Sequence, residues 1–375
     1  MTVRRLKVMT VLGTRPEIIR LSRVIPALDE ATDHVLVHTG QNYDPELSTV
    51  FFRELGLRAP DHQLDVAGAS AAETIGRTIM AVDAVLEAER PDALLVLGDT
   101  NSCLAVIAAK RRRIPVFHME AGNRCFDERV PEEINRRIVD HTADINLPYS
   151  SIAREYLLAE GIPVDRVIKT GSPLFEVLAH FRASIDASDA LARMELERGR
   201  YFLVSCHREE NVDAPERLRT FAATLAALAH TYGLPILLST HPRTRSRIEA
   251  LGVEFDPLVR LCNPFGYLDY NALQLSARAV LSDSGTISEE AAILGFPALN
   301  IRDAHERPEA MEHAVAMMTG LGPESVLRAL EVLLARKAPP TLPPDYAVPD
   351  VSAKVVRIIL SYTGYVRRTV WREET

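Results

Sequence analysis

The sequence has no apolar stretch approaching the roughly 20 residues that span a bilayer. Its N-terminus enters a strand-like segment directly, without the long apolar segment and cleavage site of a signal peptide. We therefore expect a cytoplasmic protein that does not contact a membrane. Cysteine is also scarce, because the 4 cysteines are scattered and form no C-x-x-C pair. This spacing argues against a disulfide framework and against a structural zinc site.

Excess positive charge is absent too. The formal net charge of -8 argues against a nucleic-acid surface, and the run Lys110-Arg111-Arg112-Arg113 is interpreted as a solvated helix end. His118 and Glu120 alternate on a strand, but no element has two histidines and an acid at metal-ligand spacing, so we predict no metal. The glycines around Gly13 lack the G-x-G-x-x-G spacing, which argues against a nicotinamide site and leaves no cofactor indicated.

Strand-sized apolar runs that stop at polar tips are the main feature that is present. Each run is rich in Val, Ile and Leu and precedes a helix-like stretch, which is typical of a parallel sheet buried on both faces. Ligands bind beyond the carboxyl ends of such strands. The tips are Gly13-Thr14-Arg15, Gly98-Asp99-Thr100, Glu120-Ala121-Gly122, Cys206-His207-Arg208, Thr240-His241-Pro242 and Asp283-Ser284-Gly285.

The order of these runs predicts an α/β protein with two doubly wound, Rossmann-like domains that face each other across a cleft. A chain of 375 residues is too long for one ordinary core. We expect an N-terminal domain over 1–171, a second domain over 172–350, and a helix and tail over 351–375 that pack back on the first domain. The expected strands are Leu6–Leu12, His34–His38, Ala93–Leu97, Val116–Met119, Ile145–Leu147, Val167–Lys169, Tyr201–Ser205, Pro235–Ser239, Val259–Leu261, Ala279–Ser282 and Ala298–Ile301. Ala71–Glu89, Glu132–His141 and Val351–Tyr362 are expected helices.

Small residues follow the strand Ala279–Ser282 and precede a helix. Backbone N–H groups of Ser284, Gly285 and Thr286, together with the positive helix end, could hold a diphosphate. Glu290, one turn further on, could accept hydrogen bonds from ribose hydroxyls. The alternative is an ordinary capped helix, whose Ser288 and glutamates complement the helix dipole.

The first tip places Arg15 at a strand end, where a planar guanidinium suits a phosphate or a sugar. The alternative is an ion pair with an acid of a neighbouring helix.

Carboxylates occupy later strand ends: Asp99, Glu120, and Glu132 or Glu133 at the start of the next helix. Carboxylates that converge repel, which raises the pKa of at least one of them.

His207 would face these carboxylates from the second domain and complete a general acid/base set. Each of these residues also has an alternative interpretation that is purely structural. Asp99 could cap a helix that begins at Asn101, the two glutamates could complement a helix N-terminus, and His207 could be a core histidine.

Taken together, these motifs resemble the non-hydrolysing UDP-N-acetylglucosamine 2-epimerase family. The resemblance runs from the first strand to the Pro-rich segment and keeps the motif order. The motifs are Gly13–Glu17, Gly98–Thr100, Glu120–Gly122, Pro131-Glu132-Glu133, His207-Arg208-Glu209, Ser239-Thr240-His241-Pro242, Ser282–Glu290 and Arg302–Glu309.

The resemblance implies a fold of the GT-B type, shared with many glycosyltransferases. It implies inversion of carbon 2 of a UDP-N-acetylhexosamine by anti elimination of UDP to a 2-acetamidoglycal and re-addition on the other face. It also implies Asp99, Glu120, Glu132 and His207 as catalytic residues. The substrate-binding residues implied are Arg15, Arg20, Gln41, Arg136, Arg208, His241, Ser284, Gly285, Thr286, Glu290 and Arg307.

Some positions depart from the family pattern. Arg20 replaces a lysine, and Thr286 replaces the second glycine of a Ser-Gly-Gly turn. Gln41 and His241 match two positions of an allosteric UDP-sugar site of bacterial glucosamine enzymes. However, the loop before Glu132 is shorter, and no Pro-Gly-Gln follows Val66, which argues against such a site.

Two sequence segments and the tail residue Trp371 resemble a capsule polysaccharide branch of the family more than they resemble the glucosamine enzymes. The segments are Gly98–Leu104 and His118–Asp127. This branch converts UDP-2-acetamido-2,6-dideoxy-L-talose to UDP-N-acetyl-L-fucosamine, whereas the alternative substrate is UDP-N-acetylglucosamine. Phe126 and Cys125 are candidates to contact a 6-deoxy carbon. A homodimer is the default expectation, and the alternatives to an epimerase are a GT-B glycosyltransferase and a non-catalytic nucleotide-sugar binding module.

Overall fold

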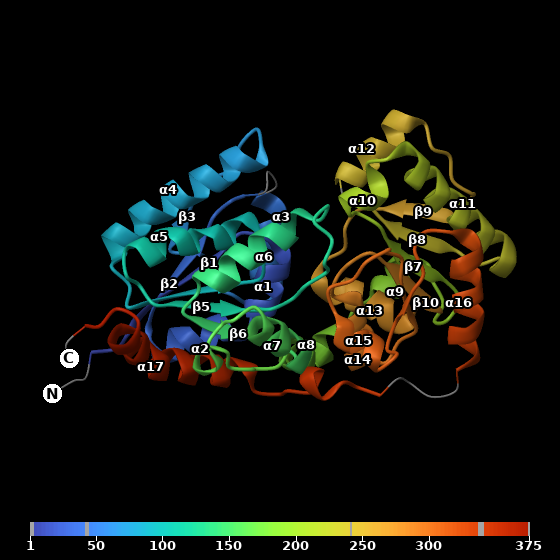
Figure 1. Cartoon of the computed structure of the whole chain (residues 1–375). Helices are drawn as coiled ribbons and strands as arrows, with labels where there is room; N and C mark the ends of the chain where they lie inside the picture. The colour runs from blue at the N-terminus through green and yellow to red at the C-terminus, as the bar shows by residue number, and fades with distance from the viewer. Residues whose placement is uncertain (1–3, 42–44, 241, 337–340, 374–375) are drawn as a thin grey trace. The chain divides into compact units, whose positions relative to one another are not determined.

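The computed structural model describes residues 4–41, 45–240, 242–336 and 341–373. These residues divide into two compact units (Figure 1). Unit 1 comprises Met1–Ala179 and Pro344–Thr375, and unit 2 comprises His180–Pro343. Within the part of the chain that is described, no helix is both long enough and apolar enough to cross a membrane.

Unit 1 contains a six-stranded parallel sheet with the strand order β3-β2-β1-β4-β5-β6. Figure 1 shows α4 and α5 on one face of this sheet and α2 and α17 on the other. The elements are β1 Lys7–Leu12, α1 Arg15–Leu21, α2 Val24–Ala31, β2 Asp33–His38, α3 Pro45–Glu54, β3 His62–Gln63, α4 Ala71–Glu89, β4 Ala93–Leu97, the 3-10 helix η1 Asn101–Ala105, α5 Val106–Arg111, β5 Val116–Met119, α6 Pro131–Thr142, β6 Ile145–Leu147, α7 Ser151–Ala159, η2 Val164–Arg166, α8 Leu174–Asp186, which continues into unit 2, η3 Pro344–Tyr346 and α17 Val351–Thr369.

Unit 2 repeats this architecture with the strand order β12-β11-β10-β7-β8-β9, also parallel throughout. The first strand of each unit, β1 or β7, therefore lies between its second and fourth strands. The elements are α9 Ala190–Arg193, β7 Phe202–Ser205, α10 Glu209–Val212, α11 Pro215–Tyr232, β8 Ile236–Ser239, α12 Pro242–Leu251, β9 Val259–Cys262, α13 Tyr267–Ser276, β10 Ala279–Ser282, α14 Ile287–Leu294, β11 Ala298–Asn300, α15 Pro308–Glu312, β12 Met317–Met318 and α16 Pro323–Ala335.

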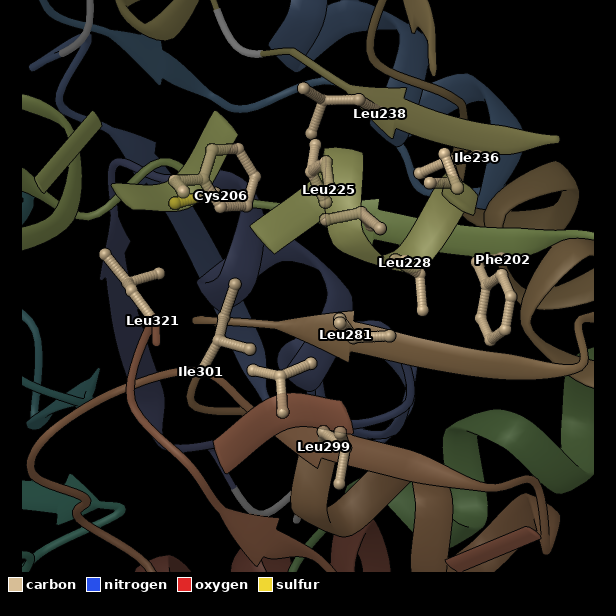
Figure 2. Packing of buried hydrophobic residues seen from close by; sticks show 14 of the residues in the cluster. Phe202, Cys206, Leu225, Leu228, Ile236, Leu238, Leu281, Leu299, Ile301 and Leu321 are labelled. Carbon is tan, nitrogen blue, oxygen red and sulfur yellow. The ribbon is translucent and has the colours of Figure 1, made fainter. Parts of the chain in front are cut away.

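Both sheets are held by continuous apolar strands, as expected for strands covered on both faces. In unit 2, side chains of β7, β8, β10 and β11 form one buried cluster with those of α11 and α16, which includes Phe202, Leu225, Leu281 and Leu299 (Figure 2). Burying side chains of this size contributes about 1.5–3 kcal/mol each. The layered core fixes the strand ends from which the polar tips project.

Helix α17 packs against α2 and is attached to unit 1 near both of its ends. At its start, the Ser352 N–H donates to Glu176 at 2.9 Å, and near its end Arg367 donates to Asp92 at 3.0 Å. The sequence predicted a helix that stops at Tyr362 and a tail beyond it. This end was wrong, because the helix continues to Thr369.

The expected strand Val167–Lys169 was also wrong. Val167 forms only an isolated parallel bridge with Asn146. The Thr170 N–H still donates to the Pro148 carbonyl at 3.0 Å, but Pro148 has no N–H to return the bond. The ladder therefore stops after one bridge.

Candidate active site

The polar tips of unit 1 follow β1, β4 and β5, three adjacent strands of its sheet. Strands β2 and β3 follow β1 on one side of the sheet, whereas β4, β5 and β6 follow on the other side. The strand order therefore reverses between β1 and β4, and α/β sheets bind ligands in the crevice at such a point. Leu97 and Met119 are paired in the sheet. Asp99 and Glu120 therefore leave neighbouring strands at nearly the same level.

Glu17 ties the tips of β1 and β4 together. Its fully buried carboxylate accepts from the N–H of Gly13 at 3.0 Å and of Thr14 at 2.7 Å, and from the Thr100 hydroxyl at 3.1 Å. Burial raises the pKa of Glu17 to about 7, although these donors oppose the shift. The residue is the N3 member of a capping box with Thr14.

Asp99 is paired with a buried arginine. Arg136 donates to the Asp99 Oδ2 from Nε at 3.0 Å and from Nη2 at 2.7 Å. The carbonyl of Asp99 accepts from the Asn135 side chain at 3.0 Å. Thr100, and not Asp99, is the N-cap of η1, so the carboxylate of Asp99 is not used to cap that helix.

Glu120 has a left-handed backbone with φ of 64°, which is uncommon for a residue with a side chain. Its Oε2 lies 3.4 Å from the Arg20 Nε, and its Oε1 accepts from Asn123 at 3.2 Å. The guanidinium of Arg20 lies over the Tyr149 ring, 5.4 Å from its centroid. Backbone strain of this kind persists only where the surroundings determine the conformation.

The loop after Glu120 is anchored by a buried ionic network. The Gly122 N–H donates to both oxygens of Asp140 at 3.2 Å, and Arg124 donates to Asp140 at 2.7 Å. Arg124 also donates to Glu160 at 2.7 and 2.8 Å, while the ring of His118 lies 3.0 Å from Asp140. These contacts hold Glu120 in its strained conformation.

The two glutamates at the start of α6 differ in their surroundings. Glu133 is 1% exposed and accepts from Arg136 at 2.9 Å and from the Cys125 N–H at 3.1 Å. Glu132 is partly exposed, and among the described residues it makes no hydrogen bond or ion pair. Glu132, the residue expected to be catalytic, is thus the one whose carboxylate is available to a ligand.

Two of the expected substrate-binding residues lie around β1. Arg15 is exposed, and its guanidinium lies over the Phe51 ring, 5.6 Å from the centroid. The side-chain oxygen of Gln41 accepts from the N–H of Ser102 at 2.9 Å and from its hydroxyl at 2.6 Å. Gln41 is therefore engaged with the segment that follows Asp99.

In unit 2, the tips of β7 and β10 meet through Asp283. This buried carboxylate lies 3.0 Å from the Nδ1 of His207 and accepts from the N–H groups of His207 and Arg208, both at 2.9 Å. Burial opposes ionisation, but the His207 imidazole and the N–H donors hold the pKa of Asp283 well below its usual value. A His207 ring protonated at Nδ1 presents its Nε2 outward, and the side chain is 37% exposed.

The small-residue turn follows directly after Asp283. The Ser284 hydroxyl accepts from the Thr286 N–H at 3.3 Å and lies 3.0 Å from the Thr286 hydroxyl. A Cβ at Gly285 would lie 3.4 Å from the carboxylate of Glu306 and 3.7 Å from the guanidinium of Arg208. The turn, the start of α14 and Arg208 are thus adjacent, which is an arrangement suited to an anion.

The remaining expected residues of unit 2 are buried or lie outside the description. Glu290 accepts from Gln274 at 2.7 Å, and Arg307 lies 3.0 Å from the buried Glu289. His241 lies outside the described residues. The structure therefore brings Asp99 and Glu120 to adjacent strand ends in unit 1, and brings His207, Arg208 and the Ser284–Thr286 turn together in unit 2.

Sequence reasoning missed the supporting residues. Glu17, Asp140 and Asp283 were not assigned roles, and Glu133 was considered only as the alternative to Glu132 in the acid/base set, yet each carboxylate holds a tip in place. A signal was available for two of them. Thr14 and Glu17 have capping-box spacing, and Glu133 and Arg136 are three apart on one helix face.

One family model and two relatives show what this chain is similar to. Residues 27–360 match the family described as Epimerase_2, UDP-N-acetylglucosamine 2-epimerase. A UDP-N-acetylglucosamine 2-epimerase of Methanocaldococcus jannaschii is 35% identical over 88% of this chain and 93% of its own. A UDP-2,3-diacetamido-2,3-dideoxy-D-glucuronate 2-epimerase of Pseudomonas aeruginosa is 33% identical over 88% and 93%.

Solved structures agree. The structure of a UDP-N-acetylglucosamine 2-epimerase from Rickettsia bellii has a TM-score of 0.92 and 49% identity, covering 99% of this chain and 100% of its own. The Methanocaldococcus jannaschii enzyme in complex with UDP-GlcNAc and UDP has a TM-score of 0.90 and 33% identity, covering 95% and 100%. The expected GT-B-like α/β fold with two parallel sheets is confirmed.

Proposed function

The chain belongs to the UDP-N-acetylglucosamine 2-epimerase family and is an isomerase, and on that premise we propose that it inverts carbon 2 of a UDP-N-acetylhexosamine. The observation that carries the proposal is the pair of carboxylates, Asp99 and Glu120, at adjacent strand ends of unit 1, each held by a buried arginine. Epimerisation requires positioned acid and base groups, and proton transfer by such groups contributes about 10²–10⁴-fold to rate.

In the proposed reaction, the anomeric C–O bond breaks first, because carbon 2 has no neighbouring carbonyl to acidify its proton. Positive charge then builds on the ring, UDP departs with the bonding electrons, and a carboxylate takes the carbon-2 proton. This elimination leaves a 2-acetamidoglycal. UDP adds back to carbon 1 while a second group returns a proton to the other face of carbon 2.

Departure of UDP requires stabilisation of its diphosphate. Arg208 supplies positive charge for this purpose, and His207, the Gly285 N–H and the hydroxyls of Ser284 and Thr286 supply donors. We assign substrate contacts also to Arg15, Arg20, Gln41, Glu290, Arg307 and His241. No cofactor is needed, because the reaction only moves a proton and re-forms the bond that it breaks.

Incubation with a UDP-N-acetylhexosamine in deuterated water tests the proposal. Deuterium should appear at carbon 2 of the recovered substrate and of its epimer. Asp99→Asn and Glu120→Gln should each reduce this exchange by about 10²–10⁴-fold. Glu128→Gln, a change of an exposed carboxylate in the same loop region, should not. Sugar transfer to an acceptor without exchange would instead favour a glycosyltransferase.

We further propose that the substrate is UDP-2-acetamido-2,6-dideoxy-L-talose, with UDP-N-acetylglucosamine as the alternative. Phe126 is 66% exposed, with one edge against Tyr156, and is available to contact a methyl group. Cys125 is less suited, because its thiol donates to Glu133 at 3.2 Å. Mass spectrometry of products from a substrate panel checks this, and Phe126→Ala should reduce a preference for 6-deoxy sugars by roughly 10-fold or more.

A role in capsule polysaccharide synthesis, a cytoplasmic location and a homodimer remain proposals from the sequence. Light scattering of the purified protein measures the oligomeric state directly.

A further inference from the structure

Arg136, on α6, is a buried arginine between two carboxylates, Glu133 on the same helix and Asp99 after β4. Its side chain is 3% exposed and donates to two carboxylates at once, to Asp99 from Nε and Nη2 and to Glu133 from Nη1 at 2.9 Å. An arginine that binds a substrate diphosphate needs donors directed at the ligand. Here three of the guanidinium's donor contacts go to carboxylates of the protein.

Glu133 fixes this arginine from the opposite side. It is 1% exposed and also accepts from the N–H of Cys125. Burial opposes its ionisation, but the Cys125 N–H and the charge of Arg136 hold the pKa of Glu133 below its usual value. Glu133 is therefore a fixed anion, and its contacts orient the guanidinium toward Asp99.

The three candidate acid/base carboxylates differ in their cationic neighbours. Asp99 has Arg136 at 2.7 Å, and Glu120 has Arg20 at 3.4 Å. Glu132 has no cation in contact among the residues that are described. Because a nearby opposite charge favours the ionised form, Arg136 and Arg20 stabilise Asp99 and Glu120 as anions.

We propose that Arg136, oriented by Glu133, is a positioning residue that keeps the Asp99 carboxylate ionised and fixed as the proton acceptor of the epimerisation. The inference rests on the proposed function. Asp99 takes the proton from carbon 2 as the anomeric bond breaks, and UDP leaves with the electron pair. Glu132 returns a proton to the opposite face as UDP adds back, and the two carboxyls are restored by proton exchange with water.

Other titratable groups surround Asp99. Arg136 and Glu133 face it from α6, and Cys103 lies on η1 close enough for Asp99 and Glu17 to raise the pKa of its thiol, which burial raises further. Burial raises the pKa of Glu17 to about 7. Because Glu17 and Cys103 are present in every variant described below, a difference between variants reports the removal of the Arg136 charge.

The pH profile of carbon-2 deuterium exchange tests the proposal. In Arg136→Met, the acidic limb should move to higher pH by about 1–3 units, with little change in KM. Arg136→Lys should retain part of the wild-type profile. Arg137→Met is the matched control, since Arg137 follows on α6 and contacts Glu133 at 3.2 Å but makes no contact with Asp99. An unchanged acidic limb with raised KM would assign Arg136 to substrate binding, and equal loss at every pH would assign it to structure alone. Either result overturns the proposal.

A stability cycle gives a readout that needs no turnover. Arg136→Met removes the arginine that donates to the partly buried Asp99 carboxylate and should lower the melting temperature. Adding Asp99→Asn to that variant should restore part of the loss, because the two changes are coupled. Strictly additive losses would overturn the proposal. A wild-type protein without any carbon-2 exchange would overturn the proposed function, while the cycle would still decide whether Arg136 and Asp99 are coupled.

Discussion

Replacement of Gly122 by alanine should reveal how tightly the loop after Glu120 is confined. Gly122 has φ of +83°, and an added Cβ would lie 2.3 Å from the carbonyl oxygen of Ala153 and 2.9 Å from the Leu157 side chain. The left-handed backbone costs an alanine about 1–2 kcal/mol. The collision with the backbone of α7 adds about 1–3 kcal/mol, because a helix carbonyl cannot rotate away. We expect unfolding free energy to fall by about 2–5 kcal/mol in total.

Gly161→Ala is the matched control. Gly161 has φ of +87° and nothing within 4 Å of an added Cβ, so only the conformational cost of about 1–2 kcal/mol applies. Gly122→Ala should also lose carbon-2 exchange, since a shift of about 1 Å in Glu120 can cost about 10²-fold in rate. Denaturant unfolding and deuterium exchange measure the two effects. Equal stability and equal exchange in both variants would refute the steric argument.

Three further changes should have measurable effects. Asp283→Asn should destabilise unit 2 at neutral pH. The difference from wild type should shrink as pH falls below about 3.8, because the carboxyl then takes up a proton in the unfolded chain while the native carboxyl, whose pKa is lowered, is still ionised; melting temperatures between pH 7 and 3 check this. Arg124→Met removes the buried arginine that Asp140 and Glu160 share and should cost about 3–5 kcal/mol, against less than about 0.5 for Arg129→Met, whose side chain is 85% exposed. Denaturant titration compares the two variants, and equal losses would contradict the buried network. Burial raises the pKa of the Cys125 thiol to about 11, so little thiolate is present at pH 7.5 and iodoacetamide should label Cys125 slowly in the folded protein. Peptide mass spectrometry measures the labelling rate, and rapid labelling would contradict the raised pKa.

Most strands could be predicted from the sequence, because parallel strands buried on both faces appear as continuous apolar runs. Ala93–Leu97 and Val116–Met119 were predicted with their observed bounds. The two-residue edge strands β3 and β12 were not predicted: His62 lies in a polar stretch, and the short apolar run Ala314–Met318 was not interpreted as a strand. Such strands form only because a completed neighbour offers its free edge.

Helix predictions depended on local signals. The helix Ala71–Glu89 was predicted with its observed bounds, and Ser70 caps it by accepting from the Glu73 N–H. Helix α17 was predicted too short because Gly364 and the basic residues beyond it resemble a helix end. Burial of Thr363 and Val366 against unit 1 extends it, which is a tertiary effect that no local window contains.

The polar tips that carry the candidate site could be predicted from the sequence. The residues that hold these tips in place could not. A lone Asp99 or Glu120 after an apolar run suggests chemistry at a strand end. The pairing of Asp99 with Arg136, 37 positions later, depends on how α6 lies across the sheet. Long-range ion pairs of this kind follow from the tertiary fold rather than from any spacing.

The attachment of α17 to α2 has a consequence for biosynthesis. A ribosome that has translated residues 1–179 has produced every strand of the first sheet, yet α2 still lacks its covering helix until residues 351–369 have been synthesised and have left the exit tunnel. Unit 2, residues 180–343, is synthesised in the interval before this helix is available. Folding of the first unit is therefore completed after translation of the second, and chaperones that bind exposed apolar surface have this interval in which to act.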